Sequence, residues 1–244
     1  MLSFLPLPHH FIVLPDDTRE PALSLQREIE TIWLAEISRT GSKVFNGSLF
    51  SVEQVSDQTV TGRFVEYRSY VAQIRRPELF SELRIQPLAV TGLLRNTDGI
   101  FFGYRSPGVA QQPNFWELIP AGGIDRKCLA ENGEIVPIRQ LLAELEEEVG
   151  LAPADVSASR LVSFCEDPEH HMFDLVWELQ TTLDTTKVLS SHAALPATEH
   201  AKIICVPWRD LDRFLAKDSP GVLPSNRDLL AHLGLMTGEN TNQR

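Results

Sequence analysis

Cysteine is scarce in this sequence, and the few cysteines are far apart. Cys128, Cys165 and Cys205 are the three in 244 residues, and no two of them have the C-x-x-C spacing of a zinc site. An odd number at such distances also argues against a disulfide framework. We therefore expect three reduced thiols in a cytoplasmic protein.

Basic residues are in short supply as well. The chain has 22 Lys and Arg against 33 Asp and Glu, which gives a formal net charge of -11. Phosphate backbones bind to clustered Lys and Arg and are repelled by a net acidic surface. The composition therefore argues against nucleic acid as a partner, and it leaves room for a small anionic ligand bound through metal ions.

The sequence also lacks a long uninterrupted hydrophobic run. The apolar segment from Met1 to Pro15 has no basic region at its start, and Pro6 and Pro8 interrupt it. It is therefore expected to be neither a signal peptide nor a membrane span, and we expect no membrane partner. We interpret it as an extended arm or an edge strand that covers apolar surface.

The composition that is present, 43% hydrophobic and 23% charged residues, is typical of a globular protein. We expect two parts. Residues 1–83 are predicted to form a small N-terminal α/β extension. In it, apolar residues recur at helical spacing over 25–37, and the β-rich runs 49–55 and 59–70 predict two paired strands.

Residues 84–244 are predicted to form the main domain. The runs 87–94 and 100–104, joined by turn residues from Asn96 to Gly99, predict a hairpin. The remaining predicted elements are strands at 115–119, 160–164, 172–179 and 202–206, and helices at 137–149, 208–215 and 226–233. This irregular order indicates an α+β fold with a mixed sheet rather than a regular parallel βαβ sheet.

The helix predicted over 137–149 carries a row of acids beside its apolar stripe. Glu144, Glu147 and Glu148 are three and four residues apart, so their carboxylates emerge from one adjoining face. Like charges at these spacings repel one another, and a divalent cation would relieve the repulsion. Carboxylate oxygens are ligands that Mg²⁺ prefers. The alternative interpretation is a solvated acidic face.

A glycine-rich turn precedes this helix. The segment from Pro120 to Asp125 contains Gly122 and Gly123 at the end of a predicted strand, where the backbone can approach a phosphate or a metal closely. Gly150 is the expected cap at the far end of the helix, with Leu151 packing back. Strand, glycine turn, acidic helix and capped exit form one unit.

This unit resembles the Nudix box, G-x5-E-x7-R-E-U-x-E-E-x-G-U, where U is apolar. Residues Glu144 to Leu151 match the last part of the pattern completely. Ala143 stands where the family has Arg, and residues 126–132 look inserted before Gly133 and Glu134. Arg139, one helical turn earlier, is a candidate replacement for the missing Arg. The box is therefore degenerate in its first half.

The resemblance implies a Nudix α/β/α sandwich with a mixed sheet and a site for Mg²⁺ or Mn²⁺. By position, Glu144, Glu147 and Glu148 would bind metal or activate water, and Ala121 would belong to the metal site. Glu134 is an uncertain fourth acid. Family members often dimerise, so a homodimer is a further implication.

The segments Gln86 to Val90, Tyr104 to Ser106 and Leu118 to Gly123 look like the strands that lead into the box of nucleotide-sugar hydrolases. Upstream, Ile32-Trp33, Val44 to Asn46, Phe50 and Tyr67-Arg68 resemble the N-terminal extension of a Nudix branch that hydrolyses UDP-glucose and UDP-galactose to UMP and a sugar 1-phosphate. The resemblance covers most of residues 25–210, loosely outside the box. It implies a nucleoside diphosphate derivative as the small-molecule substrate, with binding residues Arg105, Gly122, Gly123, Glu117 and Arg68. Arg105 would clamp the phosphates, although an exposed strand-end arginine is an equal alternative.

Other candidates and other functions stay open. Four aromatic residues are candidates to stack a base or sugar, although such residues are more often core: Phe45, Tyr67, Phe115 and Trp116. Among the loop acids, Glu166, Glu169 or the pair Glu199 and His200 could reach the site. Hydrolysis of ADP-ribose or another nucleoside diphosphate sugar is the main enzymatic alternative, and a non-catalytic nucleotide-binding module is the other.

Overall fold

The computed structural model describes residues 1–15, 21–40, 44–196, 199–216 and 221–236. Its centre is an eight-stranded mixed sheet in the order β1-β9-β10-β5-β6-β11, with β7 beside β6 and β8 beside β5. The β5–β10 pair is parallel, and the other pairs in this sheet are antiparallel. The strands are β1 (Ser3–Leu5), β5 (Leu88–Arg95), β6 (Gly99–Arg105), β7 (Trp116–Leu118), β8 (Ala121–Gly123), β9 (Val156–Asp167), β10 (Met172–Thr181) and β11 (His200–Pro207).

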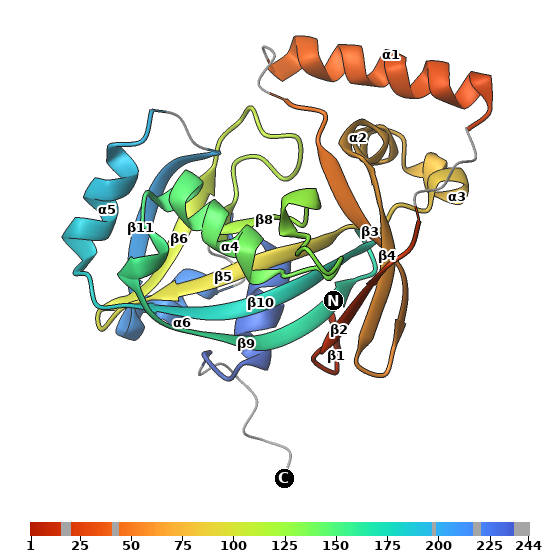
Figure 1. Cartoon of the computed structure of the whole chain (residues 1–244). Coiled ribbons are helices and arrows are strands. Elements are labelled where there is room, and N and C mark those ends of the chain that lie inside the picture. Colours follow the sequence, from red (N-terminus) through yellow and green to blue (C-terminus); the bar gives the residue numbers. More distant parts are fainter. Residues whose placement is uncertain (16–20, 41–43, 197–198, 217–220, 237–244) are drawn as a thin grey trace.

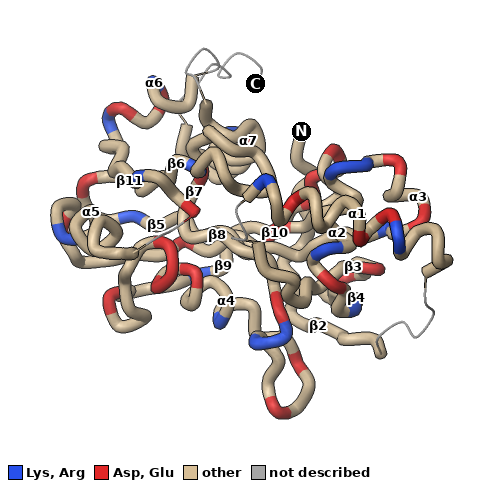
Figure 2. Tube along the Cα trace, turned by 90° about the horizontal axis from the view of Figure 1, so that it is seen from above, with Lys and Arg blue, Asp and Glu red and all other residues tan. Residues whose placement is uncertain are grey.

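Helices cover both faces of this sheet, as Figure 2 shows for α4 and α7. On one face, α4 (Ile138–Glu144) and α5 (Thr185–Ala193) pack on a core that includes Leu88 and Val90. On the other, α6 (Leu211–Leu215) and α7 (Pro224–His232) pack on a core that includes Leu93. Because successive residues of a strand face opposite sides, β5 supplies both cores. The predicted α+β fold is confirmed.

The N-terminal part has a second sheet of three strands in the order β2-β4-β3. It is formed by β2 (His10–Val13), β3 (Ser48–Ser56) and β4 (Thr59–Glu66). Three helices pack beside it, α1 (Leu23–Thr40), α2 (Tyr67–Arg75) and α3 (Phe80–Leu83), with the long α1 outermost (Figure 1). The predicted helix over 25–37 is therefore confirmed.

The strand predicted over 59–70 is too long. It ends at Glu66, and residues from Tyr67 onwards begin α2. The Asn46 side chain accepts a hydrogen bond from the Arg68 backbone N–H at 3.0 Å, which satisfies a donor in the first turn of the helix. This contact joins residues 22 positions apart, so the local sequence pattern does not contain it.

The first fifteen residues connect the two sheets. β1 pairs antiparallel with β9 at the edge of the large sheet, and β2 pairs parallel with β4 in the small one. The predicted edge strand is thus confirmed. Side chains on both sides of residue 83 share one core, since Phe50 and Phe64 pack in the same cluster as Leu88. The division of the chain at residue 83 stays a prediction.

The hairpin and the helix cap follow the sequence closely. Asn96 accepts hydrogen bonds from the backbone N–H groups of Asp98 and Gly99, at 2.9 and 3.2 Å, and closes the predicted β5–β6 turn. Gly150 has a φ of 74°, which is the left-handed conformation expected of a glycine cap. Leu151 is buried beside it.

Helix α5 has no counterpart in the sequence prediction. Its segment contains few apolar residues, of which Val188 is fully buried. Asp184 caps it by accepting from the Lys187 N–H at 2.7 Å, a local signal that the apolar pattern hides. The remaining short helices are η1 (Pro77–Leu79), η2 (Arg126–Cys128), η3 (Leu145–Val149), η4 (Pro153–Asp155) and η5 (Trp208–Asp210).

Two further expectations concern the whole chain. Cys128, Cys165 and Cys205 all carry free thiols, as the spacing predicts. In the described ranges, no helix combines the length and the apolar character needed to cross a bilayer.

Candidate active site

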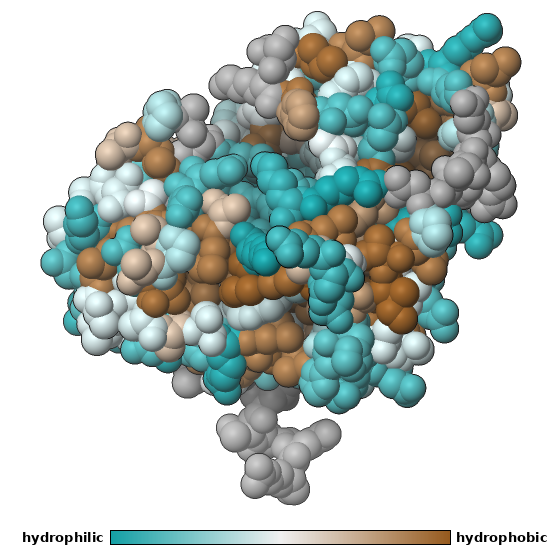
Figure 3. Space-filling view, viewed as in Figure 1, coloured by the Kyte–Doolittle hydropathy of each residue, from teal (hydrophilic) through white to brown (hydrophobic). Residues whose placement is uncertain are grey.

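A cavity of about 310 Å³ opens beside the short strand β8. Its wall is formed by β5, β8, β9, β10, the β6–β7 loop, α2, α4 and the start of α7. Hydrophilic side chains gather over the middle of the molecular face seen in Figure 3, between the N-terminal helices and the α5 side. Six of the predicted site residues line this cavity, namely Arg105, Glu117, Ala121, Gly122, Gly123 and Glu144, whereas Glu147 and Glu148 are not among the lining residues.

The glycine turn and the acidic helix meet at Gly122. A Cβ atom on Gly122 would lie 2.0 Å from the Glu144 Oε1 atom, so the absence of a side chain is what lets this carboxylate approach the turn. Gln140 fixes the same oxygen by donating to it at 2.7 Å. The segment predicted as a glycine turn is the strand β8, and neither Gly122 nor Gly123 has a positive φ. The strand lies beside the helix acid Glu144.

The helix itself changes character at its acidic end. The predicted continuous helix is α-helical from Ile138 to Glu144 and continues as the π-helical turn η3. Such wider turns change the angular spacing of the side chains and are frequent at functional sites. Here Glu148 is buried, whereas Glu147 is exposed. The three acids therefore do not share one environment.

Glu148 is held by groups from three other segments. Its Oε2 accepts from the Ala121 backbone N–H at 2.9 Å, and its Oε1 lies 3.6 Å from His200 Nδ1. Its backbone carbonyl lies 2.8 Å from His192 Nδ1. The predicted metal-site residue Ala121 thus contacts the acid through its amide.

Burial and the charges of neighbouring acids raise the pKa of both Glu144 and Glu148. Burial is the main cause that raises the pKa of Glu144 to about 7; the Gln140 hydrogen bond opposes the rise, and the charge of Glu147 adds to it. Burial also raises the pKa of Glu148 well above its usual value, and the charge of Glu144 adds to it. Glu144 can therefore exchange a proton near neutral pH, and burial favours the protonated form of Glu148.

Glu117 forms the centre of a buried polar chain. His200 Nε2 lies 2.7 Å from Glu117 Oε1, and Arg105 donates to the same carboxylate. Burial opposes the ionisation of Glu117, but the His200 hydrogen bond and the Arg105 charge outweigh it, so its pKa is lowered. The fully buried His200 thus lies between Glu117 and Glu148.

Arg105 is shared between the site and the loop above it. Beyond its pair with Glu117, its Nε donates to the Gln111 carbonyl at 3.2 Å. Its side chain is 14% exposed. Arg105 therefore lies at the cavity as predicted, but its charge is already balanced by a carboxylate.

The β6–β7 loop is fixed by the N-terminal helices. Arg39 and Arg75 both bind the buried carboxylate of Glu36, at 2.6 and 2.7 Å. Each of them also donates to the loop backbone, to the carbonyl of Val109 at 3.2 Å and of Ala110 at 3.0 Å. The Glu36 ion triad therefore positions the part of the loop that leads to the cavity.

Three further predicted residues, in addition to the exposed Glu147, lie outside this arrangement. Arg68 is not among the cavity residues, because its guanidinium pairs with Glu30 and Glu66 at 3.1 and 2.7 Å. Glu134 is exposed in the loop before α4. Arg139 does not replace the missing Arg of the box, since it donates to the Leu129 carbonyl. Gln140 fixes Glu144 instead.

The four aromatic candidates lie in different environments. Tyr67 lines the cavity, and burial raises its pKa to about 12, so its hydroxyl stays protonated. Phe45 is 82% exposed. Trp116 packs against Tyr104 and Phe214. Phe115 is not among the cavity residues.

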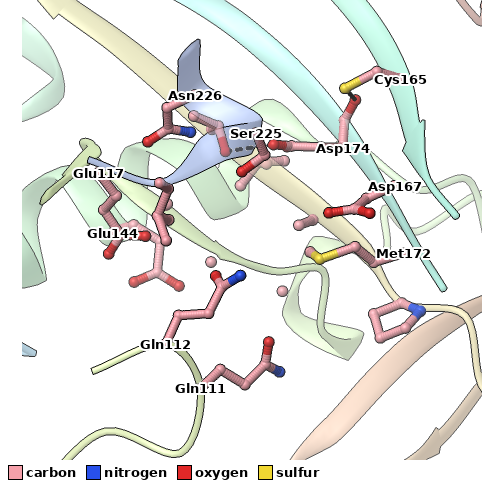
Figure 4. Close-up of a pocket in the computed structure, with 18 of the residues that line it drawn as sticks. Gln111, Gln112, Glu117, Glu144, Cys165, Asp167, Met172, Asp174, Ser225 and Asn226 are labelled. Carbon is pink, nitrogen blue, oxygen red and sulfur yellow. Dashed lines mark hydrogen bonds between the residues drawn. The ribbon is translucent and has the colours of Figure 1, made fainter. Parts of the chain in front are cut away.

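The loop acids likewise differ in whether they line the cavity. Glu199 lines the cavity and His200 is buried next to it, whereas Glu166 and Glu169 are not among the lining residues. Sequence reasoning missed several residues that line the cavity: Gln111, Gln112, Asp167, Asp174, Ser225 and Asn226 (Figure 4). They come from separate loops and strands and share no local motif.

The donor set suits a hard divalent cation, although it is not a closed cage. Within the described part of the chain, no group of three or more His, Cys, Asp or Glu side chains is placed to hold an ion. Mg²⁺ is usually held by one or two carboxylates together with water and substrate phosphates. Glu144, beside Gly122, and Glu148, on the Ala121 amide, fit that requirement in donor chemistry.

The sequence matches no family model and no curated protein. Among solved structures, the chain is similar to DR0079 from Deinococcus radiodurans, with a TM-score of 0.51 and 14% identity over 76% of this chain and 98% of that one. It also aligns with a hydrolase of the NUDIX family from Clostridium perfringens, with a TM-score of 0.37 and 14% identity over 62% and 96% of the two chains.

A third similar structure is a bifunctional NMN adenylyltransferase/ADP ribose pyrophosphatase from Francisella tularensis. Its TM-score is 0.44 and its identity 14%, over 67% of this chain and 45% of that chain. The chain thus spans less than half of the bifunctional protein. At these identities, what the D. radiodurans comparison shows is a shared fold, in agreement with the mixed sheet described above.

Proposed function

We propose that this protein is a Nudix-type pyrophosphohydrolase, which uses a divalent metal to hydrolyse a nucleoside diphosphate linked to another moiety. One observation carries the proposal. The half-buried Glu144 and the buried Glu148, whose charges repel each other, both lie against β8 in the wall of a cavity large enough for part of a nucleotide.

Glu144 and Glu148 would hold Mg²⁺ or Mn²⁺, with Glu147 as an outer acid. The bound metal would stabilise charge that develops on the phosphate oxygens and lower the pKa of a bound water. A carboxylate of this group would accept a proton from the attacking water. The backbone at Gly122 and Gly123 leaves space for a phosphate to approach.

Arg105 would orient the diphosphate from the Glu117 side of the cavity. Its pairing with Glu117 holds the guanidinium in place, and its remaining N–H groups are available to phosphate oxygens. His200 would act as a positioning residue because it lies between Glu117 and Glu148 and contacts both. Water attack then splits the diphosphate into two monophosphates.

A nucleotide sugar is the substrate that we favour, with UMP and a sugar 1-phosphate as the products of a UDP-sugar. Amide and hydroxyl side chains of the cavity wall, such as Gln111 and Ser225, support a hydroxyl-rich group next to the diphosphate. ADP-ribose is the alternative substrate. The cytoplasmic location and the homodimer predicted from the sequence remain part of this proposal.

A non-catalytic nucleotide-binding module is a second candidate. Ala143 replaces the Arg of the box, and the described residues form no three-ligand cluster, which favours this alternative. The two candidates differ in turnover. The module would bind nucleotide and leave it intact.

Hydrolysis of UDP-glucose, UDP-galactose and ADP-ribose, measured with Mg²⁺ and with Mn²⁺, tests the proposal. We expect Glu148→Gln and Glu144→Gln to reduce kcat at least 100-fold. Glu146→Gln is the matched control, because Glu146 is exposed on the same turn and is expected to keep wild-type kcat. Binding of these nucleotides without any turnover by the wild type would favour the module and refute the hydrolase.

A further inference from the structure

Asp174 places a carboxylate in the cavity wall where the surrounding strand is apolar. Its neighbours in β10, Phe173 and Leu175, are both buried. The Thr91 hydroxyl donates to Asp174 Oδ2 at 2.7 Å. The other oxygen, Oδ1, is buried and has no hydrogen-bond partner among the described residues. One oxygen of this carboxylate is therefore left to accept from the cavity.

Leaving a buried carboxylate oxygen without a donor costs free energy, because the group loses hydration and gains nothing in return. Asp167, which lines the same end, is a useful contrast. Its Oδ1 accepts from the Glu169 N–H at 3.1 Å, and its Oδ2 lies 2.8 Å from His170 Nδ1. Asp167 is satisfied by its own loop, whereas Asp174 Oδ1 has no donor among the described residues.

Asp174 lies across the cavity from the acids of the helix. It pairs in register with Ala89 of β5, and Ala89 pairs with Gly123 of β8. Two strand spacings separate the Asp174 and Gly123 backbones by roughly 10 Å. Figure 4 shows Glu117 and Glu144 on one side of the space and Asp174 on the other. This separation leaves space for one group beyond the diphosphate.

The groups that face Asp174 both donate and accept hydrogen bonds. Gln111 and Gln112 extend toward the same space from the β6–β7 loop, and Ser225 and Asn226 lie above it (Figure 4). Amides and hydroxyls of this kind suit sugar hydroxyls, since each hydroxyl donates one hydrogen bond and accepts others.

The charge of this wall excludes a further phosphate. Among the described residues that line the cavity, Arg105 is the one cation, and it is paired with Glu117. The far end carries the carboxylates of Asp167 and Asp174. A neutral group with hydroxyl donors fits this end, and an additional anion would be repelled.

We propose that Asp174 is a specificity-determining residue, whose free oxygen accepts a hydrogen bond from a hydroxyl of the sugar attached to the distal phosphate. The β9–β10 end of the cavity is then the glycosyl subsite. The proposal rests on the proposed function for the kind of substrate, and it assigns a role to residues that lie outside the Nudix box.

The test compares two ligands that differ in the sugar alone. They are the non-hydrolysable methylene-bridged analogues of UDP-glucose and of the UDP methyl ester, and binding is measured by calorimetry with Mg²⁺. We expect Asp174→Asn to weaken binding of the glucose analogue by about 10-fold to 100-fold, which is the loss typical of one hydrogen bond to a charged group. Binding of the methyl ester analogue changes less than twofold.

Glu169→Gln is the matched control, because Glu169 is an exposed acid near Asp174 in the sequence that does not line the cavity. We expect it to change binding of either analogue less than twofold. Equal weakening of both analogues by Asp174→Asn, no weakening, or no binding of the glucose analogue to the wild type would overturn the proposal.

Two further measurements keep the result independent of folding and of turnover. In the wild type, we expect removal of one particular hydroxyl from the glucose analogue to weaken binding by a similar factor, and removal of each other hydroxyl to weaken it little. Equal affinities of all the deoxy forms would overturn the subsite. A sugar-specific loss in Asp174→Asn without hydrolysis by the wild type would support the subsite and refute the proposed function.

Discussion

Replacing Gly122 by alanine tests whether the catalytic acid depends on the glycine turn. The added Cβ would lie 2.0, 2.5 and 2.8 Å from the Oε1, Cδ and Cγ atoms of Glu144. Ordinary contact begins at 3.4 Å, so Oε1 must move by at least 1.4 Å, the difference between 3.4 and 2.0 Å. The carboxylate would then leave the turn and its bond with Gln140.

The consequence for rate is much larger than the consequence for stability. A displacement of about 1 Å in a catalytic group can reduce the rate by about 100-fold. The obstructing atoms belong to a flexible side chain, and alanine suits an extended strand better than glycine does. We therefore expect Gly122→Ala to reduce kcat by about 100-fold and to change the free energy of unfolding by less than about 1 kcal/mol.

The assay combines hydrolysis kinetics with thermal melting. Gly108→Ala is the control, because a Cβ there would meet no atom within 4 Å. In the Glu144→Gln background, we expect Gly122→Ala to reduce kcat little further, since both changes remove the action of the same carboxylate. Wild-type kcat in Gly122→Ala would refute the reasoning, as would full additivity with Glu144→Gln.

Three other expectations follow from the charges. Burial is the main cause that raises the pKa of Asp174 from 3.8 to about 7, so the wild type loses stability as pH rises through this window. In denaturant titrations we expect Asp174→Asn to be more stable than the wild type above pH 7, by about 1–4 kcal/mol. This gain shrinks toward pH 4, and its absence would contradict burial as the cause. The hydrogen bond from Arg39 is the main cause that lowers the pKa of Glu36 from 4.5 to about 2, so the stability that the Glu36 carboxylate contributes is fully present above pH 4.5 and is lost as pH falls through 2. We expect Glu36→Gln to lower the free energy of unfolding by about 2 kcal/mol at pH 7 and to leave it unchanged near pH 2. A difference that does not depend on pH would count against the ion triad. We expect millimolar Mg²⁺ to raise the melting temperature of the wild type by several degrees, because a cation that binds only the folded state stabilises that state. The melting temperature of Glu148→Gln should rise much less. Equal shifts in calorimetric scans would argue against this metal site.

Local patterns in the sequence account for much of the fold. Alternation and turn residues predict β5 and β6, and helical spacing predicts α1 and the first part of the acidic helix. The glycine at position 150 has the conformation expected of a cap. These features depend on residues within a few positions of one another, and they can therefore be recognised without the structure.

The site contains contacts that no local pattern records. His200 contacts Glu117, and Asp174 accepts from Thr91, in both cases across 83 residues of sequence. The π-helical turn that separates Glu147 from Glu148 is likewise invisible in the spacing of the acids, because spacing assumes a regular helix. Side chains that meet only after the sheet has formed need the structure to be found.

The hold that α1 and α2 exert on the β6–β7 loop has a consequence for engineering and for evolution. A fragment that starts at residue 84 would keep every acid of the box but lose the two guanidinium groups that anchor Val109 and Ala110. Transplanting the box alone would thus deliver the reactive groups without one side of the chamber. Substrate choice is therefore expected to change with the first eighty residues, even where the reacting groups stay the same.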